Sequence, residues 1–248
     1  MKTIIYILFI GIIITSCNND NESSEMNEQT QKTKEVNEPM TLIPDVNFEN
    51  ALIQLNYDNT QDGKVATSSV ASLTSLNISA NGISDLTGIE DFKGLLKLRC
   101  SNNKLKHIDL SGNSSLEELD CSRNEILELD LSSNLMLKKI DCSRGLIESL
   151  NLQQNKLLKE IDCSNNQLAD LDLTANIALE DLNCTKNNLN KLGVSENINL
   201  KKMSCGNNNI SEIDISNNTA LEFLNCFPNP GNWCVYWSSE IQKKVNKK

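Results

Sequence analysis

Apolar and polar positions follow one another along most of this chain in a pattern with a 21-residue period. One period begins at Leu116 and reads Leu-x-x-Leu-x-Cys-x-x-Asn-x-Ile-x-x-Leu-x-Leu-x-x-Asn, and the frame returns at Leu158. Each period contains two apolar-polar-apolar triplets, such as 119–121 and 129–131. Side chains of an extended chain alternate between two faces, so the outer residues of a triplet point inward together. The pattern predicts stacked turns of chain, each contributing two short parallel strands.

Cysteine marks this period, because seven of the nine cysteines recur at the same 21-residue interval. Metal-binding cysteines occur as close pairs that converge on one ion, whereas these occupy a leucine position in the frame. Buried cysteine behaves as a small apolar residue, and stacked neighbours have parallel Cβ vectors that suit a disulfide poorly. We therefore expect a ladder of reduced core residues at Cys100, Cys121, Cys142, Cys163, Cys184, Cys205 and Cys226. Cys234 lies outside the period, and a disulfide between Cys226 and Cys234 stays open.

Asparagine occupies two further columns of the repeat. One comprises Asn103, Asn124, Asn166, Asn187, Asn208 and Asn229, with Gly145 as its gap; the other comprises Asn113, Asn134, Asn155, Asn176, Asn197 and Asn218. An inward amide can bond to backbone groups that the bending chain leaves without partners, in its own turn and in the next. Both columns are predicted to be structural.

The frame resembles the 21-residue nested class of leucine-rich repeats in bacterial secreted proteins. Residues 73–92 instead follow the 22-residue frame of internalins, and residues 43–53 are similar to the cap that precedes such arrays in Bacteroidota lipoproteins. The resemblance implies a leucine-rich-repeat solenoid made mainly of short parallel β-strands. Ile78 and the seven periodic cysteines mark about eight turns, which would span roughly 35–40 Å.

The amino-terminal cap should contain one short helix, because Phe48, Leu52 and Leu55 have helical spacing. We divide the chain into a signal peptide at 1–17, an acidic, disordered tether at 18–41, the cap at 42–75, the repeats at 76–225, and a carboxy-terminal cap with a basic tail at 226–248. In that last segment Trp233, Tyr236 and Trp237 are expected to cover the open end of the stack.

Segment 1–17 has the features of a secretory signal. Lys2 precedes an apolar run at 4–14, which is shorter than the roughly 20 residues that a membrane-spanning helix needs. The sequence Ile-Thr-Ser-Cys at 14–17 resembles the lipobox of bacterial lipoproteins, which implies cleavage before Cys17 and lipidation of that residue. An ordinary cleavable signal with a chance cysteine is the alternative.

The acidic start of the tether is similar to the export signal of surface lipoproteins of Bacteroidota, although a plain solvated linker explains the same residues. We expect an outer-membrane lipoprotein in the bacterial cell envelope, exposed on the cell surface. The net charge of −10 argues against nucleic acid, which requires clustered Lys and Arg.

Catalytic chemistry has little support in the sequence. His107 is the only histidine, without a placed acid or nucleophile, and neither a phosphate loop nor a hydrolase motif occurs. We expect no enzyme activity and no cofactor. A weak calcium candidate begins at Asp58, Thr60 and Asp62, but Ser69 at the closing position of an EF-hand-type loop cannot supply a bidentate carboxylate. A plain Asp-Gly turn is the simpler explanation.

The outward positions of the cysteine-bearing strands vary while the inward positions stay constant. A solenoid presents a distinctive binding surface on a uniform scaffold in this way. We call these positions the binding strip; they are Arg99, Glu118, Asp120, Lys139, Asp141, Glu160, Asp162, Asp181, Asn183, Lys202 and Phe223. The strip predicts recognition of another protein. The alternative is glycan capture, which usually needs exposed aromatic rings, and the strip has only Phe223.

Overall fold

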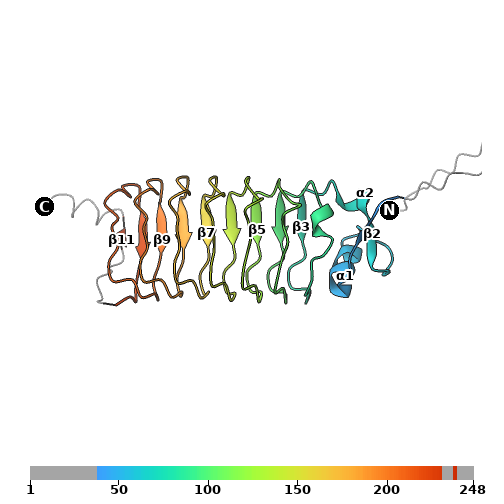
Figure 1. The fold of residues 1–248 in the computed structure, drawn as a ribbon, viewed down its shortest axis with the longest axis horizontal. Helices are drawn as coiled ribbons and strands as arrows, with labels where there is room; N and C mark the ends of the chain where they lie inside the picture. The colour runs from blue at the N-terminus through green and yellow to red at the C-terminus, as the bar shows by residue number, and fades with distance from the viewer. Residues whose placement is uncertain (1–37, 231–236, 239–248) are drawn as a thin grey trace, which may run out of the picture. The chain divides into compact units, whose positions relative to one another are not determined.

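The computed structural model describes residues 38–230 and the backbone of 237–238 (Figure 1). The expected lipidation site, most of the tether, and Trp233, Cys234 and Tyr236 lie outside the described residues. The described residues belong to one compact unit. No helix in its described part has the length and apolar character needed to cross a membrane.

The amino-terminal cap contains β1 (Met40–Leu42), α1 (Val46–Gln54), β2 (Lys64–Ala66) and α2 (Thr67–Val70). β1 pairs antiparallel with β2, so the folded cap begins at Met40, before the expected boundary at residue 42. The predicted helix is α1, which buries Phe48 and Leu52, and the Phe48 ring lies 6.1 Å from that of Phe92 in the first repeat. α1 ends at Gln54, and Leu55 is 39% exposed at its carboxy-terminal cap.

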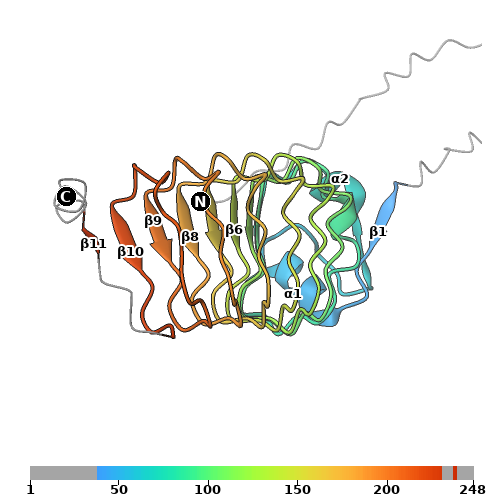
Figure 2. The same ribbon diagram turned by 60° about the vertical axis from the view of Figure 1, so that its left-hand side comes forward.

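The repeats build one sheet of parallel strands in continuous register (Figures 1 and 2). Eight strands enclose seven complete turns, and β11 (Trp237–Ser238) adds antiparallel to the last of them. This confirms the predicted solenoid. The eight are β3 (Ser75–Asn77), β4 (Lys97–Arg99), β5 (Glu118–Asp120), β6 (Lys139–Asp141), β7 (Glu160–Asp162), β8 (Asp181–Asn183), β9 (Lys202–Ser204) and β10 (Phe223–Asn225).

The predicted second strand of each turn is not formed. On that side the described residues contain one isolated parallel bridge, between Glu128 and Ser149. Asparagine side chains make contacts between turns there instead: Asn134 Nδ2 donates to the carbonyls of Leu110 and Asn113, both at 3.0 Å. The alternating Leu-Asp-Leu pattern determines which side chains face inward. It does not determine whether neighbouring backbones lie close enough to form a ladder.

The core is a continuous column of Leu, Ile and Cys side chains. Six periodic cysteines, from Cys100 to Cys205, are buried and free as predicted. The prediction of a reduced side chain was wrong for Cys226, which is buried and disulfide-bonded. The first asparagine column links adjacent turns. Asn124 Nδ2 donates to the carbonyls of Cys100 and Cys121, and its Oδ1 accepts the Leu105 N–H at 3.0 Å. Each such amide therefore contacts two turns.

Candidate functional site

The binding strip forms one continuous surface because the strands that carry it are in register. Asp120 pairs with Asp141, and Asp141 with Asp162, at equivalent positions of β5, β6 and β7. The first residue of each of these strands points to the same side as the aspartate at its third position, since the middle residue is buried. Register in the sheet therefore brings together the predicted residues from strands that are one repeat period apart in the sequence.

A shallow depression of about 350 Å³ lies over β6 to β10 on this surface. Its walls include Ser204, which occupies the same position of β9 that Asp141 occupies in β6. Arg99, Glu118 and Asp120 lie outside the depression, on β4 and β5. The lining comprises Lys139, Ile140, Asp141, Glu160, Ile161, Asp162, Asp181, Asn183, Lys202, Ser204 and Phe223.

Lysines on the strip pair with acidic residues of adjacent strands. Lys139 bonds to Glu160, and Lys202 lies 3.9 Å from Asp181. Outside the depression, Lys97 lies 2.7 Å from Glu118. These residues occupy the first position of each strand, which we call the outer column. In the sequence this column is a mixture of positive and negative side chains, and in the structure the opposite charges pair and neutralise one another.

The third positions of β5, β6 and β7 form an inner column of aspartates on the same surface, and these aspartates have no paired lysine. Within the described residues, no Lys or Arg forms an ion pair with Asp120, Asp141 or Asp162. Burial raises the pKa of Asp141; the Ser143 hydrogen bonds oppose this rise, and the charges of Asp162 and Asp120 add to it. The column is thus a row of neighbouring carboxylates, none of which lies in ion-pair contact with a described Lys or Arg, and Asp162 Oδ2 accepts a hydrogen bond from Asn183 Nδ2 at 2.9 Å.

One carboxylate oxygen of each of these aspartates has a local structural role. Asp120, Asp141 and Asp162 each accept, through Oδ1, the backbone N–H of the residue two positions on, at 3.1, 3.0 and 2.9 Å. On the opposite side Asp130 and Asp172 make the same turn at 2.9 and 3.0 Å. The Asp-x-Ser/Thr spacing, a known turn signal, would have revealed this role from the sequence.

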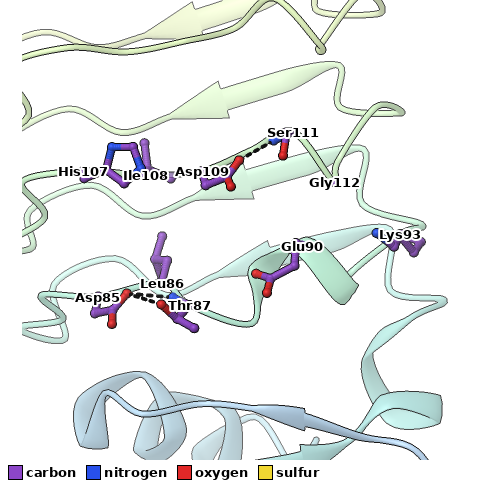
Figure 3. Close-up of a pocket in the computed structure, with 10 residues that line it drawn as sticks. All are labelled: Asp85, Leu86, Thr87, Glu90, Lys93, His107, Ile108, Asp109, Ser111 and Gly112. Atoms are coloured by element: carbon purple, nitrogen blue, oxygen red, sulfur yellow. Dashed lines mark hydrogen bonds between the residues drawn. The ribbon is translucent and has the colours of Figure 1, made fainter.

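A second depression, of about 370 Å³, lies where the 22-residue frame gives way to the 21-residue frame (Figure 3). One turn contributes the short 3₁₀ helix η1 (Ile89–Asp91) and the next contributes extended chain, so the two do not match in shape. Figure 3 shows His107 and Asp109 on one turn and Asp85 on the other. The sequence did not predict this depression.

The carboxylates of this second depression are held in local turns. Asp85 Oδ1 accepts from the N–H and hydroxyl of Thr87, and Glu90 Oε2 accepts the Gly88 N–H at 2.8 Å. The pKa of Asp109 is lowered by hydrogen bonds from Ser111 and, less strongly, by His107. Among residues 38–230, no group of three or more His, Cys, Asp or Glu side chains is arranged to hold a metal ion.

The loop at 58–63, which the sequence offered as a weak calcium candidate, is held by hydrogen bonds from its backbone that the sequence did not predict. The buried Glu49 carboxylate of α1 accepts the N–H groups of Asp62 and Gly63 at 2.7 and 2.5 Å. Asp58 Oδ1 accepts the N–H groups of Asn59 and Thr60. The loop is thus closed by backbone hydrogen bonds to two carboxylates.

Comparison with known proteins gives structural matches. No protein-family model matches the sequence, and no curated protein matches it. The functional domain of InlJ from Listeria monocytogenes, which includes a cysteine ladder, superposes with a TM-score of 0.73 at 32% identity, over 77% of this chain and 43% of that one. The chain therefore spans less than half of the InlJ structure.

Two further structures share the fold at lower identity. Internalin InlF of Listeria monocytogenes has a TM-score of 0.67 at 19% identity, over 76% of this chain and 64% of that one. A leucine-rich-repeat protein of Leptospira interrogans has a TM-score of 0.58 at 22% identity, over 72% and 47%. The described chain is an internalin-like leucine-rich-repeat solenoid which, like the functional domain of InlJ, contains a cysteine ladder.

Proposed function

We propose that this protein is a lipid-anchored component of the bacterial cell envelope that recognises another protein through the binding strip. The observation that carries the proposal is the pair of aspartates in the depression, Asp141 and Asp162, neither of which forms an ion pair with a Lys or Arg of the described chain. Crowded carboxylates at strand spacing repel one another, so basic groups of a bound protein would relieve that repulsion.

The shape of the surface supports a protein ligand. Internalin-like leucine-rich-repeat folds are typically protein-interaction modules, since stacked turns present an extended face to a partner. Phe223 stands at one end of the depression, 42% exposed, and offers an apolar contact beside the charged column. Because Phe223 is the only aromatic residue lining the depression, a stacked sugar ring is less favoured than a protein.

The anchor rests on the lipobox-like residues 14–17 and their Cys17. Outer-membrane placement and surface exposure rest on the acidic residues that follow it. Protease treatment of intact cells tests exposure. Loss of the full-length band, with a periplasmic control protein intact, is the expected result. Protection until lysis would contradict surface exposure.

Photo-crosslinking tests the strip. A photoreactive side chain at position 204, in the depression, should yield a discrete protein adduct in intact cells, whereas one at exposed Gln154 should not. Identical adducts from both positions would contradict strip recognition. The purified partner is then titrated against the double variant Asp141→Asn/Asp162→Asn, in which the amide oxygen can still accept the turn hydrogen bond.

We expect a loss of affinity of tenfold or more for that double variant. The matched control is Asp130→Asn/Asp172→Asn, which makes the same change in the same turn type on the opposite side. Equal affinity of the two variants for the partner would refute the strip as the binding surface.

A further inference from the structure

Five large apolar side chains protrude from one corner of the solenoid in four consecutive turns. They are 43–59% exposed. Three of them occupy one position of the 21-residue frame and the other two occupy the next position, so they lie close together in adjacent turns. We call them the apolar ridge: Leu135, Met136, Leu157, Ile177 and Ile198.

The ridge lies at turn tips. In each repeat the asparagine of the second column begins a tight turn, closed by bonds such as Leu137 N–H to Asn134 C=O at 3.1 Å and Leu200 N–H to Asn197 C=O at 3.0 Å. The central two residues of these turns carry the ridge, so their side chains project away from the core. Asn199 Nδ2 donates to the Ile177 carbonyl at 3.0 Å, which joins two neighbouring tips.

The fold does not require apolar residues at this corner. The preceding repeat has Ser114 and Ser115 at the same positions, and the repeat after the ridge has Thr219 and Ala220. Exposed apolar residues that are contiguous, and bracketed by polar ones, mark an interaction surface more often than scattered single residues do.

The charge around the ridge differs from that of the whole chain. The four corner segments 132–138, 153–159, 174–180 and 195–201 contain four lysines against two glutamates, a net charge of +2, while the chain carries −10. Three of these lysines are already paired: Lys159 and Lys201 share Glu180 at 3.5 and 2.5 Å, and Lys138 lies 2.8 Å from Glu117. Lys156 lies within the ridge itself, and its alkyl stem can lie along apolar surface while its ammonium group remains in the polar layer.

We propose that the apolar ridge docks on an anionic lipid bilayer, with the turn tips entering the headgroup region and Lys156 contacting lipid phosphates. Projecting aliphatic tips beside cationic side chains are the features that hold a protein in a membrane interface. The proposal rests on the proposed lipid anchor for its setting. Segment 18–37 spans at most about 70 Å when fully extended, so lipidated Cys17 would keep the solenoid within that distance of the membrane.

Vesicle flotation with residues 37–248 tests the ridge apart from the anchor, since the described residues of this segment belong to one compact unit with its own core. The protein should float with phosphatidylglycerol-containing vesicles and much less with pure phosphatidylcholine vesicles. Leu135→Ser/Ile177→Ser/Ile198→Ser should lower the bound fraction at least tenfold. The matched control Leu55→Ser/Leu127→Ser/Leu146→Ser removes exposed apolar residues elsewhere and should bind as the unmodified protein does.

Failure to float with anionic vesicles, or equal loss in both triple variants, overturns the proposal. So does light scattering that shows a dimer which the ridge variant abolishes, because a second copy would then cover the ridge. Thermal unfolding of each variant confirms that it is folded. Vesicle flotation tests the ridge, whereas the partner affinity of Asp141→Asn/Asp162→Asn tests the strip. A negative result for one proposal therefore leaves the other unaffected.

Discussion

Asp45 joins the capping helix to the first repeat through Ser84. Its Oδ2 accepts both the Ser84 backbone N–H at 2.8 Å and the Ser84 hydroxyl at 2.7 Å. Its Oδ1 accepts the N–H groups of Asn47 and Phe48 at the start of α1. One carboxylate thus begins the helix and holds it against a residue 39 positions along the chain.

Replacing Asp45 should therefore weaken the whole amino-terminal cap. Asp45→Ala removes a helix cap and several bonds to a charged acceptor, and we expect a loss of about 2–4 kcal/mol in the free energy of unfolding. Urea denaturation followed by circular dichroism measures it. Ser84→Ala removes only the hydroxyl donor and should have a smaller effect; an equal effect would show that the helix cap contributes nothing.

The same carboxylate should make stability depend on pH. Burial raises the pKa of Asp45, but the hydrogen bonds from Ser84, Phe48 and Asn47 outweigh it, and the net pKa is lowered from 3.8. A lowered folded pKa stabilises the protein above the unfolded value, and this stabilisation is lost as pH falls through the folded value. The stability difference between the unmodified protein and Asp45→Asn should be largest near pH 6 and shrink below pH 3. A difference that is constant across this range would contradict the prediction.

The free cysteines of the ladder should be chemically silent in the folded protein. Burial raises the pKa of Cys163 and of Cys205 to about 12, and the thiolate is the reactive form. Ellman's reagent at pH 8 should label none of the six free ladder cysteines in buffer and all six in guanidinium chloride. Rapid labelling of Cys163 in the folded protein would show that the ladder opens.

The second asparagine column should contribute strongly to stability. Asn176 is fully buried, and its Nδ2 donates to the carbonyls of Leu152 and Asn155 at 3.1 and 3.0 Å. Asn176→Ala removes both of these bonds, while the carbonyls of Leu152 and Asn155 each keep one backbone N–H donor. A net hydrogen bond contributes about 0.5–1.5 kcal/mol, so we expect a loss of about 1–3 kcal/mol. Ile177→Ala, at the exposed next residue, is the control for thermal unfolding and should change stability little.

Glycine at the left-handed corner positions should stabilise the solenoid. Arg123 has a φ of 55°, a conformation that costs an ordinary side chain about 1–2 kcal/mol. Arg123→Gly removes that strain, while the freer unfolded chain offsets part of the gain, so we expect about 0.5–1 kcal/mol of stabilisation. Glu125→Gly, where φ is not positive, should destabilise; the opposite order of melting temperatures would refute the argument.

The repeat period by itself determined most of this fold. A 21-residue frame that keeps Leu119, Cys121 and Asn124 in register can bury its apolar positions only if each turn stacks on the previous one, so the parallel strands and buried columns follow from the sequence. The outward strip follows from the same alternation. Helical spacing of Phe48 and Leu52 likewise predicted α1.

Tertiary structure decided what lies between repeats. Whether the second half-turn forms a strand, whether Lys139 reaches Glu160, and whether Glu49 closes the 58–63 loop all depend on distances between segments. The apolar ridge emerged in the same way, from residues that the repeat leaves unconstrained. A periodic pattern specifies the direction in which each side chain points because strand geometry alternates. Whether two outward side chains come into contact depends instead on the spacing and offset of neighbouring turns. Packing of the core determines both.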